Sequence, residues 1–443
     1  MGTIAWRCGG VFVATVLTLV ARPAYGQEAA PPELAPLPTP MVENGAELDV
    51  SRRHRPAFDP VGIPLAGNWR LYPSVASRLG FETNIYGSET DRDSGGFAQI
   101  EPSLVANTTF PSGDATIEAS GRFQRYFSQS EADQTSYRVA ASGGFDVSGT
   151  FRLEGGGNVA RLVEPRDSTG FPSGRVEPVH YQQDMVFLHG TYQSGVVRAL
   201  ATVDYTRFNF DDTKVLSADS QPIATLDQDG RDQHILRGSL AGEIAVSSGL
   251  SIFAQGISSS IHFREAEISP GMPNLSGMKN TALVGIELGT SQLLRGSIGV
   301  GYVWYDYDAS SLRTIGGVAV NADIHYFVTP LLTLSAKASR TVEQAVLEQQ
   351  SGGYISTTVS VRADYELLRA LILNFGSQYS RSVFDLQPRR DRVFGIFGGG
   401  TYHLGRRISL ELNMGFDRRR ISGDPTAPDY DDFTATSGVR FSL

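Results

Sequence analysis

The sequence of 443 residues contains a single cysteine, Cys8, so it can form neither an internal disulfide nor a metal site made of several thiolates. Its formal net charge is −9, and nucleic-acid binding, which needs a surplus of positive charge, is therefore not indicated. After residue 20, no segment has the run of about 18 apolar residues that a membrane-spanning helix requires. These absences exclude a disulfide scaffold and a bundle of membrane helices.

The beginning of the chain has the pattern of an export signal. Arg7 provides a positive charge, residues 9–20 are apolar, and Ala24-Tyr25-Gly26 resembles a cleavage site with small residues on both sides. The apolar run is too short to span a membrane as a helix. We therefore expect a signal peptide over residues 1–26, which leaves a mature chain without cysteine.

From residue 71 onward the sequence alternates between apolar and polar residues, with turn residues between the alternating segments. This period-two pattern predicts β-strands, and each strand is long enough to cross a bilayer at a tilt. The expected strands cover residues 71–86, 97–110, 115–127, 135–147, 150–162, 179–193, 196–210, 232–247, 250–263, 279–290, 295–307, 317–329, 331–341, 353–366, 370–384, 392–404, 407–420 and 431–443. The sequence thus predicts an all-β chain: a transmembrane antiparallel up-and-down β-barrel of about 18 strands, with 16 as the alternative count.

The connections support a barrel independently, because short and long ones alternate along the chain. Ser148-Gly149 and Ser194-Gly195 are typical short turns, whereas residues 163–178 and 211–231 form long loops. Short periplasmic turns and longer external loops are the rule in the outer membrane of Gram-negative bacteria, where we expect this protein. A chain that starts and ends at the periplasm also needs an even number of strands.

The final strand carries a closing signal. Thr436, Gly438, Phe441 and Leu443 occupy the places of the polar, glycine and hydrophobic residues that the barrel-assembly machinery reads in the last strand of outer-membrane barrels. Aromatic residues near the expected strand ends predict girdles at the two membrane interfaces. These aromatics are Tyr86, Phe97, Phe110, Phe127, Phe151, Tyr192, Trp304, Tyr326, Tyr365, Tyr402 and Phe416.

Residues 27–68 differ from the rest in being rich in proline and poor in periodic apolar residues. This composition predicts a disordered, extended arm in the periplasm. The segment is too short to be the folded plug of a large transporter.

A family resemblance appears where the arm meets the first strand. Residues 58–63 read Phe-Asp-Pro-Val-Gly-Ile, residues 71–74 read Leu-Tyr-Pro-Ser, and residues 84–86 read Asn-Ile-Tyr. This resembles the opening of the putative β-barrel porin 2 family. The resemblance implies an outer-membrane barrel and, because members are often encoded beside exopolysaccharide or capsule genes, a link to polysaccharide export.

The inward faces of the expected strands carry charges of both signs. They form either the selective lining of a polar channel or pairs that stiffen the wall, and both can hold together. The candidates for the lining are Arg78, Glu82, Glu101, Glu118, Arg122, Arg138, Asp146, Arg152, Glu154, Arg198, Asp204, Arg237, Glu243, Glu287, Lys337, Arg362, Asp364, Glu366 and Glu411.

Two of the long loops carry further hypotheses. Residues 163–178 form the third external loop, which either folds inward and narrows the pore or lies in solvent. In the longest loop, Asp227-x-Asp229-Gly230-x-Asp232 is spaced like part of a calcium loop, but the later bidentate glutamate is missing. Acidic external loops are common, and we expect no metal.

Catalysis has little support, because the seven histidines are scattered singly and no Ser-His-Asp or paired-carboxylate motif stands out. We expect no catalytic residues and no cofactor. The sequence favours a porin-like channel, linked by the resemblance to polysaccharide export. Its alternative is a non-conducting anchor barrel for a periplasmic polysaccharide-export assembly, and a third is an outer-membrane hydrolase. The expected partners are membrane lipid, lipopolysaccharide, the barrel-assembly machinery and periplasmic export proteins.

Overall fold

A computed structural model describes residues 49–443, except 91, 173–175, 218–220, 248, 270, 290–292, 346–351, 386 and 425–426. The expected signal peptide and residues 27–48 of the arm lie outside the described residues.

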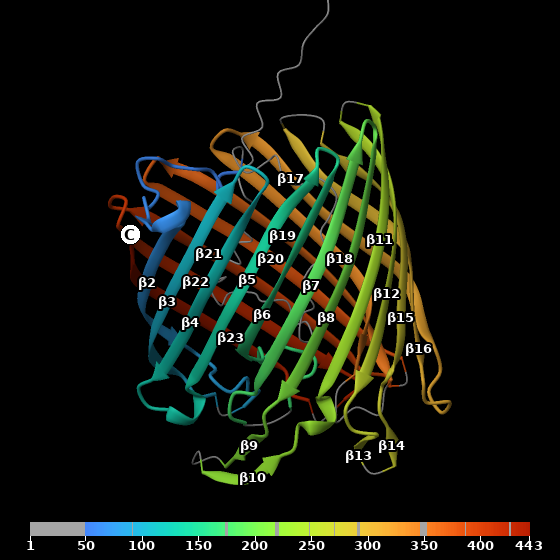
Figure 1. Cartoon of the computed structure of the whole chain (residues 1–443). Helices are drawn as coiled ribbons and strands as arrows, with labels where there is room; N and C mark the ends of the chain where they lie inside the picture. The colour runs from blue at the N-terminus through green and yellow to red at the C-terminus, as the bar shows by residue number, and fades with distance from the viewer. Residues whose placement is uncertain are drawn as a thin grey trace, which may run out of the picture.

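The described chain forms one closed ring of eighteen long strands, in which every strand pairs antiparallel with its neighbours in sequence (Figure 1). Alternating apolar and polar residues cause this arrangement, because they give each strand one face for lipid and one for the interior. In ring order, the strands are β2 (Arg70–Glu82), β3 (Gly95–Phe110), β4 (Gly113–Tyr126), β5 (Gln134–Ser148), β6 (Phe151–Val163), β7 (His180–Ser194), β8 (Val197–Phe210), β11 (Gln233–Ser247), β12 (Leu250–Phe263), β15 (Gly277–Leu288), β16 (Leu294–Tyr307), β17 (Ile315–Thr329), β18 (Leu332–Gln344), β19 (Gly353–Leu368), β20 (Leu371–Phe384), β21 (Arg390–His403), β22 (Ile408–Ser422) and β23 (Tyr430–Ser442).

The last strand closes the ring on the first. The register runs from Ser74 opposite Ser442 to Glu82 opposite Thr434, and the backbone N–H of Leu443 donates to the carbonyl of Pro73 at 3.1 Å. Closure satisfies the edges of both terminal strands, which no lipid could do. The prediction of an 18-stranded antiparallel barrel is confirmed, and the alternative of 16 strands is wrong.

The two ends of the barrel differ in their connections. One end, here called the turn end, carries the short turns, and the other, the loop end, carries the long loops, seen at the top and bottom of Figure 1 respectively. Small elements occupy the loops and the N-terminal segment: β1 (Ile63–Pro64), β9 (Thr213–Leu216), β10 (Pro222–Leu226), β13 (Glu267–Ser269), β14 (Met272–Pro273) and the 3₁₀ turns η2 (Ala66–Asn68), η3 (Ser130–Ala132) and η4 (Asp229–Arg231). None of the helical turns in the described residues has the length and apolarity to cross a membrane.

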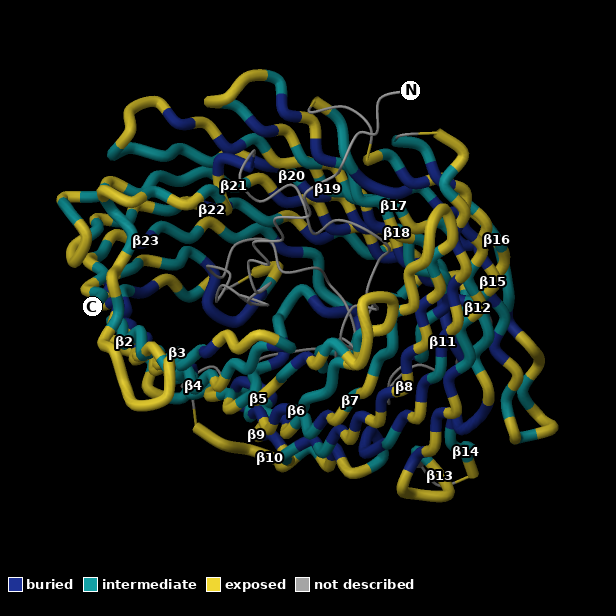
Figure 2. Tube along the Cα trace, turned by 45° about the horizontal axis from the view of Figure 1, so that its top comes forward, coloured by how far each residue is buried: buried dark blue, intermediate teal, exposed yellow. Residues whose placement is uncertain are grey.

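Each strand presents large apolar side chains outward and buries its other face. In β11, Leu236, Leu240 and Ile244 are exposed on the outside, whereas Arg237 and Glu243, on the opposite parity, are buried. The same alternation of exposed and buried residues runs along strands around the ring in Figure 2. Exposed aliphatic rows of this kind fit a lipid environment.

At the loop end the inner face becomes apolar, which the sequence pattern did not predict. Phe208, Phe210, Ile235 and Phe263 form one buried cluster with neighbouring inward residues and with Phe171 of the loop after β6. Two aromatics expected in the lipid girdles also lie inside. Tyr86 and Phe97 are buried in a second cluster, so their assignment to a girdle is wrong.

The N-terminal segment lies against the barrel in its described part, residues 49–68, instead of extending freely. Ile63 and Pro64 pair with Leu71 and Arg70 at the start of β2. Gly62 precedes this pairing with φ +72°, and a Cβ there would lie 2.7 Å from the Tyr72 ring. Glycine is required here because both the backbone angle and the close contact exclude a side chain.

Candidate functional site

Charged residues meet in a network on the inner wall where the barrel closes. Arg78 of β2 donates to Glu101 of β3 and, at 2.5 Å, to Glu411 of β22. Arg122 then pairs with Glu101, and Arg440 with Glu411, each at 2.6 Å. The network joins strands from both ends of the chain, so it ties the seam of the barrel together from the inside.

Several other lining candidates are also held in ion pairs, either across neighbouring strands or two residues apart on one strand. Arg237 donates to Asp204 at 2.8 Å, Arg362 to Asp364 at 2.7 Å, and Arg198 lies 3.9 Å from Glu243. A second network on β4 to β7 is centred on Arg152, which donates to Asp114, Asp146 and Glu154, and Glu154 lies 3.3 Å from His189. Glu82 accepts a hydrogen bond from Tyr126, and Arg138 is partly buried on β5, opposite Ser120.

In these contacts several inward charges pair across strands, whereas Arg362 pairs with Asp364, and Arg152 with Glu154, along one strand. Pairing does not remove the polarity of the wall, since Arg362 and Lys337 keep 43% of their side-chain surface exposed. The residues therefore remain candidates for a channel lining. Sequence reasoning missed His189, Asp323 and His325, although all three share the inward parity of their strands.

The third loop (residues 164–179) folds into the barrel and reaches the opposite wall. It connects β6 and β7, the fifth and sixth strands of the ring, yet Thr169 lies 3.4 Å from Ser382 of β20, the fifteenth. The carbonyl of Arg166 accepts a hydrogen bond from Arg419 of β22 at 3.3 Å. Strands half a ring apart face each other, so these contacts cross the interior. Of the two hypotheses for this loop, the structure shows the inward fold; residues 173–175 of the loop lie outside the described residues.

A fourth loop (residues 211–232) packs against the third loop at the loop end of the barrel. The third and fourth loops together are called the lid. Val176 pairs with Val215 of β9, and Glu177 N–H donates to the Lys214 carbonyl at 3.0 Å. Beneath this pairing, Arg231 donates to both oxygens of Glu164 at 2.8 and 2.9 Å, and its guanidinium lies 3.9 Å from the Phe210 ring centroid. Both partners of this ion pair are almost fully buried.

The charges at the tip of the third loop are perturbed by their surroundings. The Arg166 guanidinium lies between the rings of Tyr86 and Phe171, at 5.3 and 5.1 Å from their centroids. Burial lowers the pKa of Arg166, against the opposing charge of Glu82. Burial likewise raises the pKa of Asp167 to about 6, although the Arg419 charge acts in the opposite direction. The docked loop therefore carries a carboxyl group that binds a proton at a higher pH than an ordinary aspartate does.

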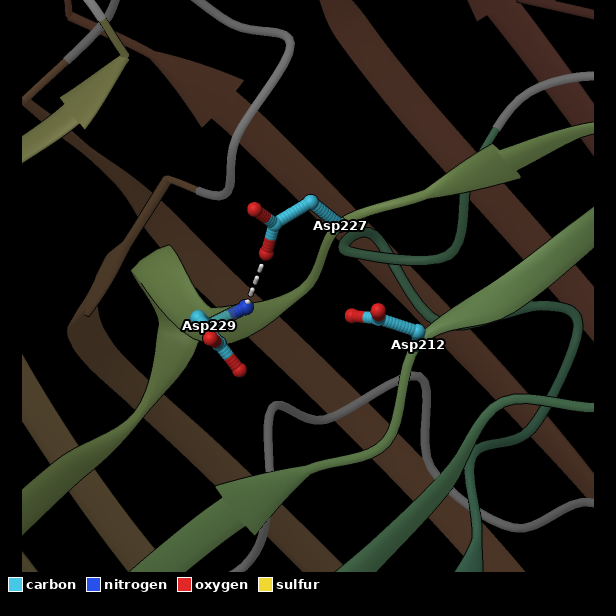
Figure 3. Close-up of side chains that lie close together, drawn as sticks. All are labelled: Asp212, Asp227 and Asp229. Carbon is cyan, nitrogen blue, oxygen red and sulfur yellow. Dashed lines mark hydrogen bonds between the residues drawn. The ribbon is translucent and has the colours of Figure 1, made fainter.

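Three exposed carboxylates come together on the outside of the lid. Figure 3 shows Asp212, Asp227 and Asp229, whose oxygens lie within 4.8 Å of one another. Asp227 accepts a hydrogen bond from the backbone N–H of Asp229 at 2.8 Å, and Asp212 accepts one from the N–H of Gln228 at 3.2 Å. Asp232, the third residue of the calcium-like spacing, instead accepts from the N–H of Phe210 at 2.8 Å. Local backbone hydrogen bonds thus explain the positions of the Asp212, Asp227 and Asp232 carboxylates.

A Ser-His-Asp row occurs on β17 and β18 near the turn end. His325 lies 3.0 Å from the hydroxyl of Ser335 and 3.1 Å from Asp323. Sequence reasoning missed it because cross-strand register, not sequence spacing, brings Ser335 opposite His325. Lys337 takes the other oxygen of Asp323 at 3.3 Å, and Asp49 lies 3.9 Å from the imidazole. The row is therefore part of a wider set of ion pairs.

The closing-signal residues occupy the seam. Thr436 is buried, Phe441 is exposed on the outer face, and Gly438 lies opposite Arg78. A Cβ at Gly438 would lie 2.5 Å from the side chain of Arg78, so glycine gives the seam network its room.

A family match agrees with this architecture. A family model described as putative beta-barrel porin 2 matches residues 55–442. A search of curated proteins found no match. Similar solved structures include the outer-membrane protein OpdK of Pseudomonas aeruginosa, with TM-score 0.44 and 11% identity over 84% of this chain and 99% of that one. The siderophore receptor PiuA of Acinetobacter baumannii has TM-score 0.43 and 9% identity over 86% and 82%. A bacterial polysaccharide outer-membrane secretin has TM-score 0.36 and 8% identity over 83% and 98%.

Proposed function

The chain belongs to the putative beta-barrel porin 2 family, and from this premise we propose that it forms an outer-membrane channel for small polar solutes, narrowed by its lid. By the rule for outer-membrane barrels, the turn end faces the periplasm and the loop end faces the outside. The outer face lies in membrane lipid and lipopolysaccharide.

One observation supports a channel most strongly: the third loop crosses the interior above a wall lined with paired charges of both signs. Such a wall holds water and favours polar solutes over apolar ones. A loop that spans the ring limits the size of what passes. Charge pairing across strands also keeps the barrel wall rigid, so the constriction formed by the third loop is surrounded by a wall of fixed shape.

Conductance of the purified protein in planar bilayers tests this proposal. We expect discrete conductance steps for the intact protein and larger steps when residues 166–175 are deleted. A deletion of residues 217–221 at the tip of the β9–β10 hairpin is the matched control, because it leaves Glu164 and Arg231 in place. A silent intact protein together with a silent 166–175 deletion, both shown to be folded, would sink the channel.

The lid itself favours the alternative, a non-conducting anchor barrel. Buried apolar and ion-paired contacts hold it across the loop end, and a lid that never opens would close the pore. In that case the barrel serves a periplasmic polysaccharide-export assembly, the context that the family resemblance implies. Co-purification of periplasmic export proteins with the intact chain, and their loss when residues 27–68 are removed, would support the anchor.

A further inference from the structure

A segment before the barrel, the strap (residues 49–59), lies along the inner rim of the turn end. Val50 is fully buried, and its N–H donates to the hydroxyl of Thr333 on β18 at 3.0 Å. Phe58 stacks on His403 of β21 with ring centroids 5.6 Å apart. The strap thus contacts the wall from β21, the sixteenth strand of the ring, to β18, the thirteenth.

Hydrogen bonds to backbone carbonyls of the strap and of a turn also hold the strap in place. The carbonyl of Pro56 accepts a hydrogen bond from Arg406, in the turn between β21 and β22, at 3.0 Å. Arg53 donates to the carbonyl of Pro330, in the turn between β17 and β18. The strap is therefore held at several points of the periplasmic rim.

Two arginines of the strap meet one wall carboxylate, and Asp49 of the strap lies 3.9 Å from the imidazole of His325. Glu366 of β19 lies 3.4 Å from the guanidinium of Arg53 and 3.6 Å from that of Arg55. The neighbouring wall carboxylates are paired with cations of the wall itself: Asp364 with Arg362 at 2.7 Å, and Asp323 with Lys337 at 3.3 Å. Glu366 differs from both in that its ion pairs in the described residues come from the strap.

The ion pairs of Arg53 and Arg55 with Glu366 have a geometry from which a competing cation can displace the arginines. Both guanidinium groups approach the same oxygen of Glu366 at distances above 3.3 Å, without the two parallel hydrogen bonds of a bidentate pair. Arg53 keeps 22% of its side-chain surface exposed, Arg55 12% and Glu366 10%, so a competing cation must displace both guanidinium groups to reach the carboxylate. Glu366 would face the interior of the barrel as an unneutralised carboxylate if the strap left.

We propose that Glu366 is a cation-binding subsite at the periplasmic mouth, and that the strap is a tethered blocker which occupies it with the guanidinium groups of Arg53 and Arg55. The ligand class is a small solute with a guanidinium or ammonium group, which competes with the strap for Glu366. This inference rests on the proposed channel function and adds its selectivity and regulation.

Block of the channel by a mimic of the strap tests the subsite. Deleting residues 49–59 is expected to raise the single-channel conductance and to make the channel sensitive to arginine amide added from the turn end. Citrulline amide, which has the same shape without the charge, is the control and should not block. Adding Glu366→Gln to the deletion should weaken the block by arginine amide up to roughly fivefold, the loss of one charge pair that the deletion leaves open to water. Equal block with and without Glu366, or no change in conductance on deletion, would overturn the proposal.

A second measurement separates failure of this inference from failure of the channel. Since the expected mature chain contains no cysteine, Arg52→Cys provides a single attachment point for a spin label on an exposed position of the strap. In detergent, Glu366→Gln should increase the mobility of this label, whereas the matched control Asp364→Asn should leave it unchanged. If the protein shows no conductance in bilayers but the label responds in this way, the channel proposal is refuted and the binding of the strap to Glu366 is supported. A label that is equally immobile in both variants would refute the binding of the strap to Glu366.

Discussion

The outer and inner faces of the same strands are organised differently. Outside, exposed side chains such as Leu240 and Val284 stand in rows and depend on the lipid around them. Inside, residues such as Arg78 depend on partners from distant parts of the chain. The outer face is therefore a local property of each strand, whereas the inner face is a property of the closed ring and of the segments folded into it.

Closure of the ring is the condition for both faces, and removing it should have the largest effect. Deleting Phe441 to Leu443 takes away the residues that pair with Ser74 and Val75 and with the Pro73 carbonyl. An open edge cannot be satisfied by lipid, so assembly should be lost almost completely. The measurement is the heat-modifiable migration of the protein from outer-membrane fractions in gel electrophoresis.

Deletion of residues 49–51 from the strap is a control of equal size, since these residues contribute no strand to the ring. We expect this variant to assemble. Normal assembly of the variant that lacks Phe441 to Leu443 would mean that the remaining β2–β23 pairing suffices for closure.

On the inner face, the buried pair of Glu164 and Arg231 should be the most sensitive point. Arg231→Ala leaves the Glu164 carboxylate buried without its cation, which costs about 3–5 kcal/mol when the partner of a buried pair is removed. The third loop should then detach, and limited proteolysis should cut it within residues 164–179. Lys214→Ala is the matched control in the same lid, because the pair of Lys214 with Glu177 is exposed and worth about 0–1 kcal/mol. Equal protease resistance of both variants would show that the ion pair does not hold the lid.

Neighbouring positions on β15 compare the two faces directly. Val284 points outward and is 64% exposed, whereas Glu287 points inward and is 4% exposed. Val284→Arg should cost about 2–4 kcal/mol near the middle of the membrane. Glu287→Gln keeps the shape of the side chain and should change the free energy of unfolding little. Urea-induced unfolding in liposomes measures both, and equal effects would contradict the assignment of faces.

The same distinction decides what the sequence could predict. Alternation predicted all eighteen strands and the outward side of residues such as Val284, because lipid selects each position independently. It also placed Arg78 and Asp204 on the inner face, but not their partners, which register between strands determines. For the third loop the sequence left two positions open, one inside the barrel and one in solvent. Nothing in the local pattern of residues 49–59 indicated a docked strap, because its contacts depend on Thr333 and Glu366, almost 300 residues or more away in sequence.

The smallest expected effect is a pH dependence of the lid, which has no counterpart on the outer face. Asp167 has a pKa of about 6 in the docked loop because of burial, against an ordinary value of 3.8 when the loop is detached. Since the docked pKa is the higher one, docking is favoured most below about pH 4, where the group is neutral in both states. Docking of the third loop weakens as the pH rises through 6, and above that the free-energy cost of docking the ionised Asp167 stays constant.

Conductance should therefore increase between pH 4 and 6. Asp167→Asn should remove the share of this increase that comes from the loop. Arg419, whose charge acts on Asp167, and Asp417 and Tyr430, on which the charge of Asp167 acts, remain in the wall. Asp229→Asn, on the exposed outside of the lid, is the control and should keep the pH profile of the unaltered protein. An unchanged profile in Asp167→Asn would show that burial of this carboxyl group does not govern the docking of the third loop.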